Sequence, residues 1–336
     1  MKNNLWIVYL ASFIVVCGGV KLANSVIMPF LMALFIAIVI NPFINQLQNK
    51  LKLPRILAFS IVIAVIFFLL GFVINTTLNT LNGLLSYMPE LSSKLNALSM
   101  QILGKLSEYG IENISIPSEL EPNKILSASV EFLKNGGVIV SKSFFVFLLV
   151  TFMLFGTQIF TEKIKYFAAT NPKTEPLIKS FISNLKSYLV IKTLASLATG
   201  VFIFIGLSIL GVKYAPLWGI LAFVLNFIPT IGSIIAAIPA LLVSLALNDF
   251  MITVWVLALY LAVNISIGNF IEPKFLSKGL GLSVLVVLLS LLFWGFLLGV
   301  GGMFLAVPLT MSIKIALLAN QNTKFIAVLL SDKIDE

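Results

Sequence analysis

Long apolar runs dominate this chain and limit what it can fold into. A bilayer core about 30 Å thick takes about 20 helical residues, so most of the runs are long enough for one span. With 60% hydrophobic and 10% charged residues, the 336-residue chain carries more apolar surface than a globule of its size can bury. We therefore expect an all-α polytopic membrane protein with about 7 to 8 spans. The runs cover residues 5–20, 26–40, 56–74, 138–160, 194–210, 217–247, 252–267 and 280–313.

Two of these runs are longer than one span requires, and each is interrupted by Gly, Pro and polar residues. Such breaks free backbone groups, which are tolerated at membrane depth only where protein or a wet cavity satisfies them. Paired breaks are typical of transport sites built from discontinuous or re-entrant helices. The alternative is that the glycines only permit close helix packing and the prolines only kink the helices. The candidate pathway residues at the breaks are Asn226, Pro229, Thr230, Gly232, Gly299 and Gly302.

A polar cluster lies between the two broken runs, in the sequence NISIGNFIEPK. It contributes Asn269, Glu272, Pro273 and Lys274 to the candidate pathway. An ionisable residue inside a membrane is often functional, so Glu272 could carry protons or pair with a cation. The alternative is an ion pair at the level of the lipid headgroups that marks the end of a span.

Residues 76–137 form a segment of different composition, rich in Glu, which we place outside the membrane. Apolar residues spaced alternately three and four apart follow one helical seam, which must be buried against something. An intramolecular hairpin with residues 125–133 would bury it, and so would contact between protomers of a homo-oligomer. The candidate oligomerisation residues on the seam are Leu84, Met88, Leu91, Leu95 and Leu98.

Basic residues in the short loops set the expected orientation, because such loops face the cytoplasm. Six lysines from Lys163 to Lys192 predict one cytoplasmic loop, and the N-terminus is then cytoplasmic too. The expected regions are a three-span part (1–75), the extracytoplasmic helical segment (76–137), a span with its basic loop (138–193), a transport core (194–318) and a tail (319–336).

Several classes of chemistry are excluded by what the sequence lacks. There is no His and only one Cys, so a Ser-His pair, a His-bound metal and a thiolate cluster cannot form within one chain. No phosphate-binding GxxxxGK[ST] loop occurs, so we expect no ATP-driven transport, no enzyme activity, no cofactor and no metal. The net charge of +9 is spread between apolar runs without interleaved aromatic residues, which fits lipid headgroups better than nucleic acid.

Three stretches resemble signature blocks of the autoinducer-2 exporter family of bacterial membrane proteins: PFLMALFIAIVINPF, LNFIPTIGSIIAAIPALL and the region from NFIEPKFLSKGLG to the end of the last run. The resemblance covers nearly the whole chain and is closest to the quorum-signal branch. It implies export of autoinducer-2, a small polar furanone-derived signal, across the cytoplasmic (inner) membrane. Other members resemble sodium or lithium/proton antiporters, so monovalent cations are the alternative substrate.

Overall fold

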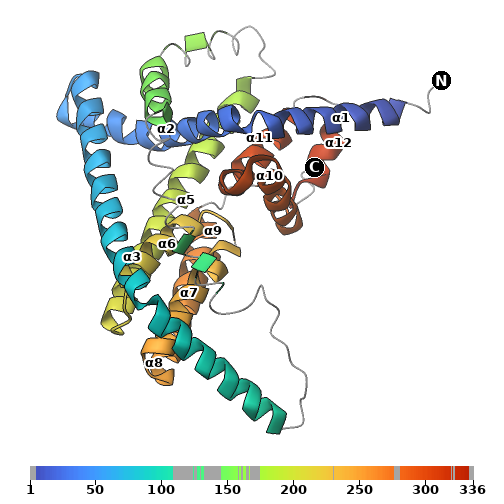
Figure 1. Cartoon of the computed structure of the whole chain (residues 1–336). Helices are drawn as coiled ribbons and strands as arrows, with labels where there is room; N and C mark the ends of the chain where they lie inside the picture. The colour runs from blue at the N-terminus through green and yellow to red at the C-terminus, as the bar shows by residue number, and fades with distance from the viewer. Residues whose placement is uncertain are drawn as a thin grey trace. The chain divides into compact units, whose positions relative to one another are not determined.

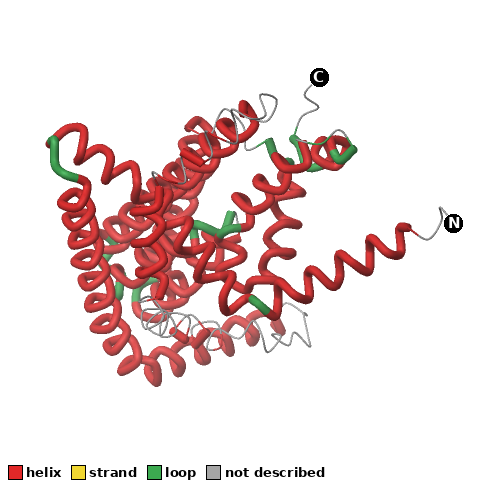
Figure 2. Tube along the Cα trace, turned by 90° about the horizontal axis from the view of Figure 1, so that it is seen from above, coloured by secondary structure: helices red, strands yellow, loops and turns green. Residues whose placement is uncertain are grey.

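A computed structural model describes residues 5–108, 124, 127–128, 130–131, 145–157, 159, 162–163, 166, 175–229, 231–275, 281–318, 320 and 322–332. Within these residues the structure is helical and contains no strand (Figures 1 and 2), as the sequence predicts. The helices are α1 (Leu5–Leu22), α2 (Asn24–Leu51), α3 (Arg55–Glu108), α5 (Glu175–Ile209), α6 (Ala215–Leu225), α7 (Ile231–Leu247), α8 (Phe250–Asn264), the π-helix η3 (Ile265–Ile271), α9 (Glu272–Phe275), α10 (Val284–Phe304), α11 (Ala306–Leu318) and α12 (Lys324–Leu329).

Among the described residues, five helical stretches are long and apolar enough to cross a membrane: Asn24–Leu51, Arg55–Lys105, Ile182–Ile209, Phe250–Ile271 and Val284–Phe304. Their outward faces carry large apolar side chains, such as Phe68 and Ile209, that are mostly exposed in the single chain. Lipid would cover such surface in a membrane protein. Further apolar helices of 10–17 residues are shorter than a span, so the expected number of about 7 to 8 spans stays a prediction.

The chain divides into two compact units. The first unit comprises residues 1–59, 142–191 and 276–336, and the second comprises residues 60–141 and 192–275. Helices α3 and α5 each pass from one unit into the other. The regions expected from the sequence describe membrane and extramembrane parts of the chain and stay a prediction.

Small residues bring the helices of the second unit close together. A Cβ on Gly200 of α5 would lie 2.8 Å from the carbonyl oxygen of Gly219 in α6. A Cβ on Gly219 would likewise lie 2.9 Å from the carbonyl oxygen of Gly200. Six residues further along α5, a Cβ on Gly206 would overlap the side chain of Leu259 in α8. Close approach of this kind is how helices associate where the hydrophobic effect cannot drive them together.

The broken run 217–247 is interrupted, as its Pro and Gly residues predict, and its two halves form a helical hairpin, which the sequence left open. Helix α6 ends at Leu225, residues 226–229 turn, and α7 begins at Ile231 and packs against α6 (Figure 1). Gly232 is required at this turn, because a Cβ there would collide with the backbone carbonyl of Leu225. At about 1.5 Å per residue the two helices are about 16 and 25 Å long, so neither alone matches a bilayer core of about 30 Å.

The broken run 280–313 also contains the predicted interruption, in the first unit. Gly299 has φ 68° and ψ −155°, a conformation open in practice only to Gly, and it kinks α10 before α11 begins at Ala306. Gly302 faces the Trp294 carbonyl, leaving no room for a Cβ, and Gly301 faces Met28 of α2. The core of this unit contains Tyr188, Leu189, Leu282, Val307 and Met311.

The predicted seam on α3 is buried within a single chain. Leu84 and Leu91 are fully buried and Leu95 nearly so, whereas Met88 and Leu98 are half-buried. The Tyr214 hydroxyl donates to the Gly83 carbonyl at 3.1 Å, which fixes the loop before α6 against this part of α3. Most of the second helix of the expected intramolecular hairpin, residues 125–133, lies outside the described residues, so the hairpin stays a prediction. The assignment to contacts between protomers stays a prediction.

Candidate transport site

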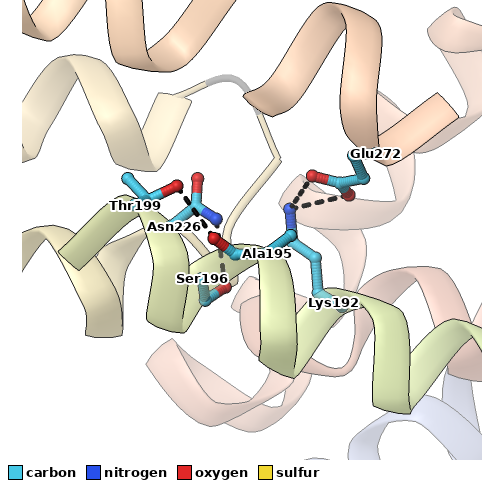
Figure 3. Close-up of polar contacts among 6 residues, drawn as sticks. All are labelled: Lys192, Ala195, Ser196, Thr199, Asn226 and Glu272. Atoms are coloured by element: carbon cyan, nitrogen blue, oxygen red, sulfur yellow. Dashed lines mark hydrogen bonds and ion pairs between the residues drawn. The ribbon is translucent and has the colours of Figure 1, made fainter. Parts of the chain in front are cut away.

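One face of α5 in the second unit carries three polar side chains that are almost completely buried. Lys192, Ser196 and Thr199 are spaced by four and three residues, which places them on the same side of the helix. Their exposed fractions are 4%, 0% and 2%. The Thr199 hydroxyl donates to the Ala195 carbonyl of its own helix at 3.0 Å, so its proton is satisfied locally. The other two side chains reach partners on other elements (Figure 3).

Lys192 forms an ion pair with Glu272, which lies 80 positions away in the sequence. Its Nζ donates to Glu272 Oε1 at 2.9 Å and to Oε2 at 3.0 Å, so one ammonium contacts both carboxylate oxygens (Figure 3). The side chains are 6% and 15% exposed. Charges this far from water are retained only when they are paired, because an isolated buried ion is strongly destabilising.

A π-helix positions Glu272 for this contact. Helix α8 continues through η3 into α9, and Asn264, Ile265 and Glu272 at the junctions all keep right-handed helical dihedrals. Glu272 is therefore held at a fixed place on a continuous helical rod. A π-helix is rare and frequently occurs at functional sites, where it shifts the helical register by the extra residue that it holds.

The break between α6 and α7 contributes the second contact with α5. Asn226 lies at the C-terminal end of α6, is 9% exposed, and donates through Nδ2 to Ser196 Oγ at 3.0 Å. Asn226 and Glu272, both predicted as pathway residues, thus meet the same helix one turn apart (Figure 3). The arrangement places a cation, an anion, an amide and a hydroxyl within one buried polar set. From here on this set, Lys192, Ser196, Asn226 and Glu272, is called the α5 polar cluster.

The other predicted pathway residues lie outside the α5 polar cluster. Asn269 and Lys274 are exposed, on η3 and α9. Pro229 is in the hairpin turn next to Gly232, and its carbonyl accepts from the Ile231 N–H at 2.6 Å. Thr230 falls outside the described residues, and Pro273 is described only as backbone of α9. Gly299 and Gly302 belong to the first unit, where they shape the kink in α10.

Lys192 was not among the predicted pathway residues, and the prediction that it lies in a loop was wrong. It was grouped with five lysines in a cytoplasmic loop, but it lies within α5 and is buried. The expected neighbour of Glu272 was Lys274, which is exposed while Lys192 holds both carboxylate oxygens. The available signal was weak: Lys192 shares a helical face with Ser196 and Thr199 at the start of an apolar run.

The α5 polar cluster has the composition of a site for a small polar molecule. Its one carboxylate and one ammonium cancel in charge, and the amide and hydroxyl add neutral hydrogen-bonding groups. Glu272 is its only acid, and among the described residues no three His, Cys, Asp or Glu side chains come together as a metal site would need. Buried polar groups in apolar membrane helices are typical of substrate or ion pathways.

A polytopic helical protein with two interrupted apolar runs and a paired charge buried among its helices has the features of a membrane transporter. Comparison with known proteins agrees with this class. The chain belongs to the AI-2E family of transporters, whose family model matches residues 7–322.

Two relatives match almost from end to end. A Haemophilus influenzae protein named "Putative transport protein" is 39% identical over 347 residues, which cover 100% of this chain and 99% of that protein. The Escherichia coli AI-2 transport protein TqsA is 36% identical over 329 residues, which cover 97% of this chain and 95% of TqsA. The family resemblance seen in the sequence is thereby confirmed.

Proposed function

We propose that this protein exports autoinducer-2 across the bacterial cytoplasmic membrane and that the molecule passes the α5 polar cluster. The observation that carries the proposal is the meeting of Glu272 and Asn226 with one buried face of α5. A small, hydroxyl-rich signal can exchange hydrogen bonds with an ammonium, a carboxylate, an amide and a hydroxyl. The similarity to TqsA over 97% of the chain supports autoinducer-2 as the substrate.

The helix breaks supply a way to move the molecule without ATP. The α6–α7 hairpin carries Asn226 at its turn, so displacement of the hairpin would remove Asn226 from Ser196 and change the cluster. Rocking of discontinuous helices around a fixed site is the usual basis of alternating access in secondary transporters. Energy would then come from the substrate gradient or from an ion gradient. The proposed homo-oligomer and the cytoplasmic N-terminus are part of the same hypothesis.

The test measures autoinducer-2 inside and outside cells of a deletion strain that carries wild-type or variant protein. We expect Asn226→Ala and Glu272→Gln to raise the intracellular and lower the extracellular fraction. Asn269→Ala asks whether the exposed amide on η3 also matters, and Lys186→Gln, an exposed lysine of α5, is the matched surface control. Equal partition of the signal for wild type, deletion and the two cluster variants would reject the proposal.

Sodium or lithium/proton antiport is the second candidate, and the buried Glu272 carboxylate is the observation that favours it. A carboxylate in a cavity is the essential group of such an antiporter. Growth of the deletion strain in high sodium or lithium separates the two functions, because only loss of antiport lowers tolerance to these ions. Measuring both phenotypes in the same strains makes the comparison direct.

A further inference from the structure

We propose that the Lys192 ammonium is a tethered counter-ion that occupies the cation position of Glu272, and that it thereby makes the site select uncharged polar solutes and exclude free Na⁺ and Li⁺. This inference rests on the proposed function, because it assumes that the α5 polar cluster lies on the transport path. It assigns Lys192 a role in specificity that the family membership does not supply.

The geometry of the Lys192–Glu272 pair is the first argument that the ammonium fills the cation position. Nζ of Lys192 lies 2.9 and 3.0 Å from the two oxygens of Glu272, so both oxygens already contact a positive charge. Hard cations bind through oxygen ligands, and a free cation at this carboxylate would need the same oxygens. The ammonium is attached to α5 and is therefore always present at high local concentration.

The second argument is that the Lys192 ammonium repels a free cation. A cation about 4 Å from the ammonium is repelled by it. At the effective dielectric constant of a protein site, this repulsion weakens binding of the cation on the order of a thousandfold. The remaining members of the cluster, Ser196 and Asn226, are neutral and add no compensating negative charge. Sodium or lithium could bind only after Lys192 had moved away from Glu272.

The same balance of charge favours an uncharged, hydroxyl-rich solute. Hydroxyl groups both donate and accept, so they can bridge the ammonium and the carboxylate while the pair stays together. Such a solute adds no net charge to the site. This favours its binding because the site is buried, with Lys192 only 4% exposed to solvent. The substrate class that fits is therefore a neutral polyol or sugar-like molecule rather than an alkali ion.

The test compares the thermal stability of the purified full-length protein in sodium, lithium and N-methylglucamine chloride at equal ionic strength. We expect the Tm of wild type to be the same in all three salts. Lys192→Ala frees Glu272, so sodium or lithium should raise its Tm in a saturable manner, by about 2–4 °C at ten times the dissociation constant. The increase should vanish in the double variant Lys192→Ala with Glu272→Gln.

Controls make each outcome decisive. Lys186→Ala, which removes an exposed lysine of the same helix, should behave as wild type, and Lys192→Gln is the second variant if the alanine variant does not fold. A sodium-dependent Tm in wild type that Glu272→Gln abolishes would overturn the proposal. So would a folded Lys192 variant whose Tm does not respond to sodium or lithium.

The two hypotheses can fail independently. The Tm measurement uses only inorganic salts, so it reports on Lys192 and Glu272 whether or not the protein carries autoinducer-2. Unchanged autoinducer-2 partition in the Asn226 and Glu272 variants would reject the proposed function, while the ion response of the Lys192 variant would still decide whether the lysine excludes cations.

Discussion

Removing one charge of the Lys192–Glu272 pair should destabilise the protein far more than removing both. Lys192→Met leaves the carboxylate of a side chain only 15% exposed without its partner. Breaking a buried pair in this way costs about 3–5 kcal/mol, because an uncompensated charge stays in the interior. The double variant Lys192→Met with Glu272→Leu removes both charges and keeps the volume similar, so we expect it to be neutral or more stable by about 1–4 kcal/mol.

Reversible unfolding by SDS in mixed micelles measures these differences. Buffers with N-methylglucamine in place of sodium keep an alkali ion from substituting for Lys192. The double-mutant cycle then isolates the interaction from the separate packing effects of the two side chains. If the single variants cost less than about 1 kcal/mol, the pair behaves as an exposed surface ion pair, and its placement in the buried cluster is refuted.

Three further predictions concern other parts of the structure. Asn226→Ala removes the donor to a fully buried hydroxyl and should cost about 1–3 kcal/mol in the same SDS titration; a change near zero would contradict the contact. Gly299→Ala should cost about 1–3 kcal/mol because of its φ and ψ, whereas Gly71→Ala, in open space on α3, should not destabilise. Leu91→Glu with Leu95→Glu should lower stability; a lower detergent-solubilised mass would assign the seam to protomer contacts, and an unchanged mass would assign it to the intramolecular hairpin.

The helix breaks could be predicted because their causes are local. Gly232 and Gly299 interrupt apolar runs where the backbone needs a residue without a Cβ, and Asn226 is polar in a run that is otherwise apolar. The same reasoning found the seam on α3, because burial at a spacing of three and four residues is visible in one helix. In each case the signal and the structural feature occupy the same short stretch of chain.

The ion pair could not be predicted in the same way. Its two members are 80 residues apart, and nothing in the sequence near Lys192 says that Glu272 will meet it. Lys192 follows other lysines, so its position suggested the cytoplasmic loop, and only tertiary packing shows that it is buried. Asn269, a polar residue three positions before Glu272, lies on an exposed part of η3, so its place in the pathway stays a prediction.

The π-helix between α8 and α9 makes the charge pair depend on helical phase. Each residue of an α-helix turns the chain by about 100°, so one residue gained or lost changes the direction of every later side chain by about that angle. If η3 relaxed to α-helical spacing, Glu272 would rotate away from α5 even though its own side chain had not changed. Seven residues, Ile265–Ile271, thus set the angular position of a charge that lies beyond them.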